Sequence, residues 1–203
     1  MEVDIKVVDQ NTEELLIISG MSGSGKSTVI KALEDIGYFC VDNFPAAMIN
    51  ELLNHLTGDD RKYDKVALTI DTRSIQSVDE YANVIDELNE RDIPFTTLFL
   101  DSEDDVLLRR YKETRRLHPF MDAGRIGLEE AIAKERDFLN SVKNGSDMIL
   151  DTSHLSTAET KQKIIELFDY DLKGRLNVHF ISFGFKYGIL QDADIVFDVR
   201  CLK

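Results

Sequence analysis

The chain has 203 residues, of which 43% are apolar, so it can bury the core of one α/β domain without requiring a second. Its 38 acidic and 24 basic residues give a net charge of -14, which would repel a phosphate backbone and makes this chain by itself a poor nucleic-acid binder. The longest apolar runs have only strand length, and the amino terminus is acidic where a signal peptide is basic. We therefore expect a cytoplasmic protein with no membrane span and no export signal.

A glycine-rich segment near the amino terminus, Gly20–Ser27, has the form G-x-x-x-x-G-K-S of a phosphate-binding loop. It follows the apolar run Leu15–Ile18, which is typical of a buried parallel strand, and precedes apolar residues at helical spacing. The three glycines of the loop allow successive backbone N–H groups to turn toward an anion, and the start of the helix adds its dipole. We expect Lys26 to reach the β and γ phosphates and Ser27 to bind Mg²⁺. The residues expected to contact the nucleotide are Gly20, Met21, Ser22, Gly23, Ser24, Gly25, Lys26 and Ser27.

After this loop, strand-like runs alternate with amphipathic helical stretches, which predicts a parallel sheet with helices on both faces. Further strands are expected at 38–41, 66–70, 95–100 and 148–150. Helices are expected from Pro45 to Leu56 and around 78–88. Two more should begin after Ser102 and Ser156, because each serine is followed three residues later by an acid, as in a capping box. The fold class is therefore α/β, a P-loop NTPase.

An acidic residue directly follows each of the later strands: Asp42, Asp71, Asp101 and Asp151. Ligands of open α/β sheets bind outside the carboxyl ends of the strands, so these acids should surround the phosphate site. We assign Mg²⁺ to Asp71, because an apolar strand followed by an acid has the Walker B form. The alternative for Asp71 is a helix cap or turn residue, and for Asp101 and Asp151 capping is at least as well supported as catalysis.

The densest positive charge lies in Arg109–Pro119, an arginine-rich segment in an otherwise acidic chain. Guanidinium groups match phosphate oxygens, and a basic segment that closes over a triphosphate would neutralise charge during phosphoryl transfer. We interpret the segment as a lid in which Arg115 and Arg116 are catalytic candidates. The alternative is a solvated helix face whose arginines pair with carboxylates. His118 could shuttle a proton, but before proline it is interpreted as a structural turn residue.

These segments carry a resemblance at two levels. The loop, the strands that end in an acid and the arginine-rich helix resemble nucleoside monophosphate kinases and related small-molecule kinases. The sequences of individual segments are similar to those of the RapZ/YvcJ family of bacterial nucleotide-binding proteins, from about Leu15 onward. The segments that carry this similarity are 20–27, 33–38, 41–43, 71–73, 114–119 and 182–188.

The RapZ/YvcJ resemblance implies binding and hydrolysis of ATP and GTP with Mg²⁺, and a second nucleotide-contacting segment formed by Asp71, Thr72, Arg73 and Ser74. It also implies a regulatory role for an adapter that binds a small RNA and presents it to a ribonuclease. The family continues into a basic carboxyl-terminal domain. We therefore expect a polar and disordered extension at 1–13, a nucleotide-binding domain at 14–173, and the truncated start of a further domain at 174–203.

Three functions remain open at this point. The first is a nucleoside-triphosphate hydrolase that acts as a switch. We expect it to be slow, because Gln76 is the only nearby candidate to orient water and its support is weak. The second is a kinase whose acceptor pocket involves Asp42 and Asn43. The third is an adapter that needs the missing carboxyl-terminal region to bind RNA or a ribonuclease. A homo-oligomer is compatible with all three, and the sequence does not choose between ATP and GTP.

Overall fold

The computed structural model describes residues 14–56, 63–114, 116–121 and 126–169. The chain divides into two units, Met1–Lys173 and Gly174–Lys203, and every described residue belongs to the first. The predicted extension at 1–13 and the predicted further domain at 174–203 therefore lie outside the described residues. Among the helices that are described, none is both long and apolar enough to cross a bilayer.

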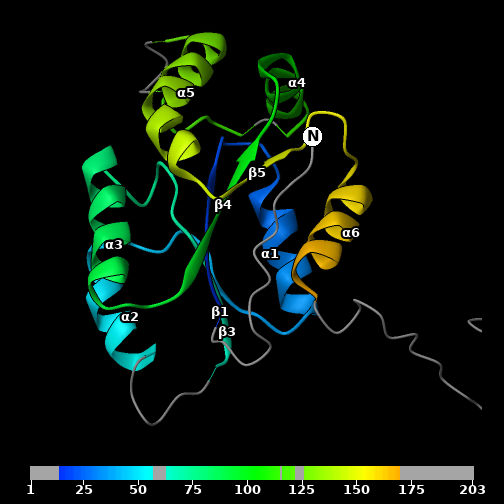
Figure 1. The fold of residues 1–203 in the computed structure, drawn as a ribbon. Helices are drawn as coiled ribbons and strands as arrows, with labels where there is room; N and C mark the ends of the chain where they lie inside the picture. Colours follow the sequence, from blue (N-terminus) through cyan, green and yellow to red (C-terminus); the bar gives the residue numbers. More distant parts are fainter. Residues whose placement is uncertain (1–13, 57–62, 115, 122–125, 170–203) are drawn as a thin grey trace, which may run out of the picture. The chain divides into compact units, whose positions relative to one another are not determined.

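The described part of the chain forms a five-stranded parallel sheet in the order β2-β3-β1-β4-β5 (Figure 1). The strands are β1 (Glu14–Gly20), β2 (Phe39–Val41), β3 (Lys65–Thr69), β4 (Phe95–Asp101) and β5 (Met148–Asp151). Strand β1 lies at the centre, where Leu16 is in register with Ala67 of β3 and with Thr96 of β4. Because all strands run the same way, their carboxyl ends share one edge of the sheet, which confirms the predicted parallel α/β architecture.

Helices cover both faces of this sheet (Figure 1). One face carries α1 (Lys26–Asp35) and α6 (Thr157–Phe168), which pack against each other. The other face carries α2 (Ile49–Leu56), α3 (Val78–Glu90) and α5 (Leu128–Gly145), and a short 3-10 turn, η1 (Ala46–Met48), precedes α2. The remaining helix, α4 (Asp104–Thr114), follows β4 at the carboxyl edge and contacts α5.

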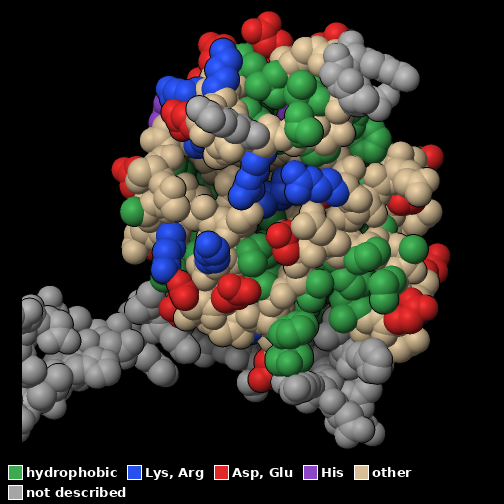
Figure 2. Space-filling view, turned by 180° about the vertical axis from the view of Figure 1, so that it is seen from behind, with side chains coloured by type: hydrophobic (Ala, Val, Ile, Leu, Met, Phe, Trp, Pro, Cys, Tyr) green, Lys and Arg blue, Asp and Glu red, His purple; other side chains and the backbone are tan. Residues whose placement is uncertain are grey.

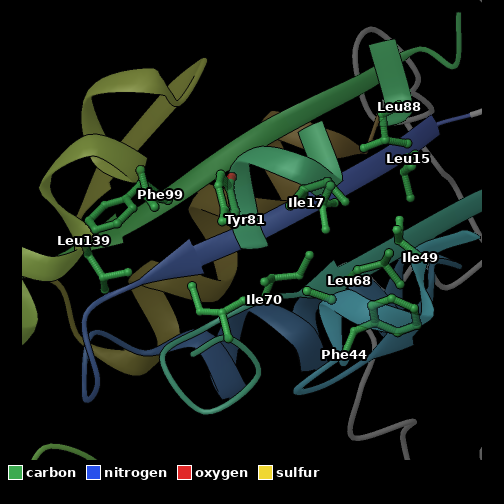
Figure 3. Close-up of a cluster of buried hydrophobic side chains, with 14 of the residues drawn as sticks. Leu15, Ile17, Phe44, Ile49, Leu68, Ile70, Tyr81, Leu88, Phe99 and Leu139 are labelled. Atoms are coloured by element: carbon green, nitrogen blue, oxygen red, sulfur yellow. The ribbon is translucent and has the colours of Figure 1, made fainter. Parts of the chain in front are cut away.

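The middle of strand β1, Leu15–Ile18, is apolar at every position because both of its faces are buried. Leu16 and Ile18 belong to the apolar cluster beneath α1 and α6, whereas Leu15 and Ile17 belong to the cluster beneath α2, α3 and α5. Figure 3 shows the second cluster, in which Ile17 lies among side chains from neighbouring strands and helices. Each fully buried Leu or Ile stabilises the fold by about 1.5–3 kcal/mol, so this strand holds both layers together.

Two helix predictions have different outcomes. The capping box at the start of α6 is confirmed: the Ser156 hydroxyl accepts a hydrogen bond from the Glu159 amide, and the Glu159 carboxylate accepts one from the Ser156 amide. The capping box at Ser102 is wrong. In the described structure the buried Ser102 hydroxyl has no hydrogen-bond partner, and the Ser102 amide donates to Asp101 Oδ1 at 2.7 Å instead of to Asp105.

The 18-residue helix α5 is an element that we did not predict. Its buried residues recur at helical spacing and are Ala131, Ile132, Glu135, Leu139 and Val142. This periodicity is visible in the sequence, but the otherwise apolar face has a glutamate in its middle. That glutamate is important for the site described next.

Candidate functional site at the carboxyl edge of the sheet

The loop Gly20–Ser27 connects the central strand β1 to helix α1 at the carboxyl edge of the sheet. Gly20 has a φ of +143°, and a Cβ atom placed there would lie 2.3 Å from the Leu100 carbonyl oxygen of β4. Gly25, with a φ of +104°, is the N-cap of α1. The loop therefore needs glycine both for its close approach to β4 and for its left-handed backbone at the start of the helix.

Lys26 lies almost entirely inside the loop, with 10% of its side chain exposed. Its Nζ donates hydrogen bonds to the carbonyl oxygens of Gly20 (2.7 Å) and Met21 (3.1 Å) and lies 3.7 Å from Asp71 Oδ2. Burial lowers the pKa of Lys26, while the negative charges of Asp71 and Glu135 act in the opposite direction. An ammonium group is thus held at the mouth of a phosphate-binding loop, with an acid from β3 beside it.

The turn after β3 places the predicted second segment next to this loop. Asp71 is buried, and its Oδ1 accepts a hydrogen bond from the Arg73 amide at 2.9 Å. The Ser74 amide donates to the Asp71 carbonyl at 2.9 Å and closes the turn. The Thr72 hydroxyl donates to Glu135 Oε1 at 2.9 Å. The structure therefore brings Lys26 and Asp71 together and uses Thr72 for a different contact.

A cleft of about 560 Å³ opens over the loop. Its described lining includes five basic side chains and three acidic ones. The basic residues are Lys26, Arg73, Arg109, Arg110 and Arg116; the acidic ones are Asp42, Asp71 and Glu113. In Figure 2, Lys and Arg side chains gather near the centre of the face opposite the view of Figure 1. A chain with a net charge of -14 thus lines this cleft with an excess of positive charge, which favours a polyanionic ligand.

The predicted loop residues do not all face the cleft. Residues 22–27 line it, and the Ser27 side chain is exposed there. By contrast, the Met21 side chain is fully buried in the core, so only its backbone contributes to the site. The Ser22 amide donates to Glu135 Oε2 at 2.9 Å, and the Ser24 side chain is fully buried. The anion-binding surface is therefore narrower than the whole motif.

The arginine-rich segment contributes to the wall of the cleft. Arg110 is fixed in place: its guanidinium donates to the Gly23 carbonyl (3.0 Å) and to the carbonyl (2.7 Å) and hydroxyl (3.1 Å) of Thr152. The Thr152 hydroxyl in turn donates to the Ser24 carbonyl at 2.7 Å. Arg116 also lines the cleft and is exposed, whereas Arg115 lies outside the described residues. α4 and the loop after β5 are thus bonded to the phosphate loop through Arg110 and Thr152.

The acids that follow the other strands have different surroundings. Asp42 lines the cleft, and its Oδ1 accepts hydrogen bonds from the Asn43 amide (3.0 Å) and the Thr69 hydroxyl. Asp151 accepts from the Ser153 amide at 2.8 Å, which is a turn contact. Asp101 is bound by Arg136 at 2.9 Å and by Lys143 at 2.6 Å, so it belongs to an ion-pair cluster of α5.

Glu135 is the residue of the site that the sequence analysis missed. It lies on the buried face of α5, is 0% exposed, and accepts hydrogen bonds from Ser22, Thr72 and His118. His118 is itself buried, with 2% exposure, so its predicted structural role agrees with its position. A single charged residue on the apolar face of α5 was the signal that could have revealed this site.

Mg²⁺ prefers a few oxygen ligands from the protein and keeps several waters. The Ser27 hydroxyl and the Asp71 carboxylate both belong to the lining of the cleft and are ligands of this kind. In the described ranges no group of three or more His, Cys, Asp or Glu side chains is arranged to hold a metal ion. The donor set therefore fits a magnesium ion that arrives with phosphate oxygens better than a metal bound by the protein alone.

Comparison with known proteins identifies the family. Residues 13–171 match the RapZ-like N-terminal domain, and residues 176–203 match the RapZ C-terminal domain. A nucleotide-binding protein of Caldicellulosiruptor bescii is 43% identical over 188 residues, which cover 92% of this chain and 65% of that protein. A nucleotide-binding protein of Lactobacillus johnsonii is 45% identical over 200 residues, which cover 95% of this chain and 66% of that protein. The chain thus spans just under two thirds of the length of these relatives.

Solved structures show the same fold at much lower identity. Shikimate kinase from Acinetobacter baumannii, in complex with shikimate, aligns with a TM-score of 0.54 and 16% identity, covering 80% of this chain and 96% of that chain. A gluconokinase from Sinorhizobium meliloti aligns with a TM-score of 0.50 and 18% identity, covering 77% of this chain and 92% of that chain. The fold is that of P-loop kinases, and the chain belongs to the RapZ-like family of nucleotide-binding proteins.

Proposed function

We propose that this chain binds ATP or GTP together with Mg²⁺ in the cleft over Gly20–Ser27 and hydrolyses the nucleotide slowly. The observation that carries the proposal is the position of Lys26, whose ammonium lies at the phosphate loop and 3.7 Å from Asp71. The excess of basic side chains in the cleft supports a triphosphate rather than a neutral ligand. The names of the relatives support nucleotide binding and leave the choice between ATP and GTP open.

Ser27 and Asp71 are the proposed ligands of the magnesium ion. When bound, the ion would neutralise charge on the phosphate oxygens. Lys26 would supply a further positive charge to the β and γ phosphates, and the exposed amides of the loop would orient them. Arg116, together with Arg115, would add positive charge from the arginine-rich segment.

Slow rather than fast hydrolysis is expected from the composition of the cleft. Efficient nucleotide hydrolases orient the attacking water with a glutamine or an equivalent residue. Gln76, the candidate in the sequence, is exposed and does not belong to the lining of the cleft, and its backbone N–H donates to the Glu80 carboxylate. The lining drawn from the described residues contains no glutamine. A nucleotide that stays bound for a long time before it is hydrolysed suits a regulatory switch.

The output of that switch would be the RNA-binding adapter function of the family. The match of residues 176–203 to the RapZ C-terminal domain supports a link between the nucleotide site and such a domain. A small RNA or a ribonuclease would be engaged through the carboxyl-terminal region, because the net charge of -14 disfavours RNA binding by the present chain. We place this activity in the cytoplasm.

A small-molecule kinase is the second candidate, and one observation favours it. Asp42 lies in the same cleft as Lys26, and Thr69 and Asn43 hold its carboxylate in one orientation. A fixed carboxylate near the γ-phosphate position could accept the proton of an acceptor hydroxyl. Asp42 would then be the base and Arg73 would bind an anionic group of the acceptor.

Measurement of phosphate release separates the two candidates. The hydrolase proposal expects slow release of phosphate from Mg·ATP or Mg·GTP that does not depend on any added hydroxyl compound. The kinase expects fast consumption of nucleotide only when an acceptor is added, with the phosphate found on the acceptor. Rapid acceptor-dependent transfer that is lost in Asp42→Asn would overturn the hydrolase proposal. The exposed Asp35→Asn, on α1, is the matched control.

A further inference from the structure

The buried carboxylate of Glu135 has no role in the proposed nucleotide chemistry, yet it receives four hydrogen bonds from three separate segments. From the phosphate loop, Ser22 donates its amide to Oε2 (2.9 Å) and its hydroxyl to Oε1 (2.7 Å). From the turn after β3, Thr72 donates its hydroxyl to Oε1 (2.9 Å). From the segment after α4, His118 Nε2 lies 3.1 Å from Oε2.

The carboxylate is well satisfied in this position. Burial by itself would raise the pKa of Glu135, but hydrogen bonds from His118 and Ser22 and the nearby charge of Lys26 outweigh it and lower the pKa. The ring of His118 is oriented as a donor, because its Nδ1 accepts a hydrogen bond from the Phe120 amide at 3.2 Å. The proton of the neutral ring therefore lies on Nε2 and points to Glu135. Burial of a carboxylate costs free energy unless donors satisfy it, so Glu135 is stable in this position only while all three segments keep their positions.

The three segments joined by Glu135 are those that line or adjoin the nucleotide cleft. Ser22 is in the phosphate loop, and Thr72 is next to Asp71. His118 is only two residues after Arg116, so their Cα atoms can be at most about 7 Å apart. Within the arginine-rich segment, Arg116 therefore lies in the chain between the end of α4 at Thr114 and the bonded His118.

A second contact links the same segments. The ring of Tyr111 in α4 lies 5.0 Å from the ring of His118, measured between centroids. Tyr111 also packs on the phosphate loop, where a Cβ atom added to Gly23 would lie 3.2 Å from its ring. Movement of His118 would therefore disturb both the ring that covers the loop and the carboxylate that holds it.

We propose that Glu135 is a positioning residue that couples the phosphate loop and the Asp71 turn to the arginine-rich segment through His118. Binding of a triphosphate at the loop would then stabilise the arginine-rich segment, and loss of the anchor at His118 would weaken binding at the loop. The coupling concerns the site of the proposed function and rests on it for its ligand. The contacts of Glu135 themselves can be tested without nucleotide.

The test uses the full 203-residue chain and the variants Glu135→Gln and His118→Phe. Glutamine keeps the shape of Glu135 but removes its charge and one acceptor, and phenylalanine keeps a ring beside Tyr111 but removes the donor. Glu130→Gln is the matched control, because Glu130 is on the same helix and is exposed. Hydrogen exchange is followed by mass spectrometry in peptides that cover 20–27, 71–76 and 116–121, without nucleotide, and Mg·ATP affinity is measured with a fluorescent analogue.

We expect Glu135→Gln to speed exchange in all three peptides together and to weaken Mg·ATP binding by about tenfold, as loss of a hydrogen bond to a charged group would do. His118→Phe should speed exchange in the peptide 20–27, although His118 does not itself bond to that loop. If Arg116 acts through the same coupling, Arg116→Ala should cost less turnover in the Glu135→Gln background than in the wild-type chain.

A purely structural role predicts a different pattern. Glu135→Gln would then lower the melting temperature, speed exchange in α5 alone and leave Mg·ATP affinity equal to that of Glu130→Gln, which would overturn the coupling while the proposed function stood. Conversely, a wild-type chain that binds Mg·ATP and releases no phosphate would end the hydrolase proposal. The exchange and affinity comparisons would still decide the role of Glu135.

Discussion

Asp71 and Asp101 lie at the carboxyl ends of the two strands that flank β1, and in the sequence they share the pattern of an apolar run followed by an acid. Asp71 lies beside Lys26 and belongs to the cleft. Asp101 forms ion pairs with Arg136 and Lys143, both from α5, and accepts a hydrogen bond from the Ser102 amide. The pattern of strand and acid is therefore not sufficient to identify a functional carboxylate. The cations that other elements bring to the acid decide whether it serves the site or the scaffold.

The largest effect is expected for Lys26→Ala, which removes the charge next to Asp71. Saturating nucleotide at about 100 times its dissociation constant should stabilise the wild-type chain by about 2.7 kcal/mol, and this gain should disappear in the variant. The measurement is thermal unfolding with and without Mg·ATP. Lys31→Ala, an exposed lysine of the same helix, is the control and should keep the full gain. Undiminished stabilisation of Lys26→Ala would defeat the assignment of the loop.

Asp71 and Asp101 should give different results when each is changed to asparagine. Asp71→Asn should weaken Mg²⁺-dependent nucleotide binding at least tenfold, or about 1.4 kcal/mol, with a smaller effect on the chain without nucleotide. Asp101→Asn should leave affinity unchanged and lower the free energy of unfolding by about 1–3 kcal/mol, since Lys143 loses its charged partner and Arg136 keeps only Asp104. Titration calorimetry and denaturant unfolding measure the two quantities. An exchange of these outcomes would mean that Asp101 serves the metal.

The dependence of stability on pH should also distinguish Asp101 from Asp71. Burial would raise the pKa of Asp101, but hydrogen bonds from Lys143 and Arg136 outweigh it and lower the pKa below its ordinary value of 3.8. Because the folded chain binds this proton less readily than the unfolded chain, the carboxylate stabilises the fold above the ordinary pKa. That contribution is lost as the pH falls toward the lowered pKa. Melting temperatures between pH 6 and about pH 3 should fall less steeply in Asp101→Asn; equal slopes would count against the ion pairs.

The smallest effect is expected for Arg91→Ala, at an ion pair that does not belong to the lining of the cleft. Arg91 pairs with Glu87 at 2.9 Å and donates to Asn50 and Asn54 of α2. The groups are partly exposed, so the variant should lose about 1 kcal/mol or less of unfolding free energy. Nucleotide affinity should be unchanged. A loss of affinity here would show that the cleft depends on the α2 and α3 layer.

The sequence contained most of the fold and about half of the site. The apolar runs predicted all five strands, because a parallel strand buried on both faces must be apolar at nearly every position, as Leu15–Ile18 is. The phosphate loop was recognisable because its glycines and Lys26 are close together in the chain. Glu135 is 113 residues away from Ser22, and only the packing of α5 against the loop brings them together. No local pattern specifies such a contact.

Local rules also failed where another residue competed for the same group. The Ser102 capping box did not form, because the Ser102 amide, which the box would bond to Asp105, donates to Asp101 Oδ1, and α4 begins only at Asp104. Asp101 has the same appearance as Asp71 in the sequence, and its partners Arg136 and Lys143 belong to the helix that we did not predict. The missing helix therefore accounts for the unpredicted contacts of both Glu135 and Asp101.

A crystal structure of the chain with Mg²⁺ and a non-hydrolysable ATP analogue would test the central claim most directly. The account predicts that the β and γ phosphates contact Lys26 and the loop amides, and that the metal binds Ser27 and meets Asp71 directly or through a water. Asp101 should remain bonded to Arg136 and Lys143. A triphosphate bound outside the cleft, or a metal bound to Asp101 with Asp71 still turned to Lys26, would contradict the account.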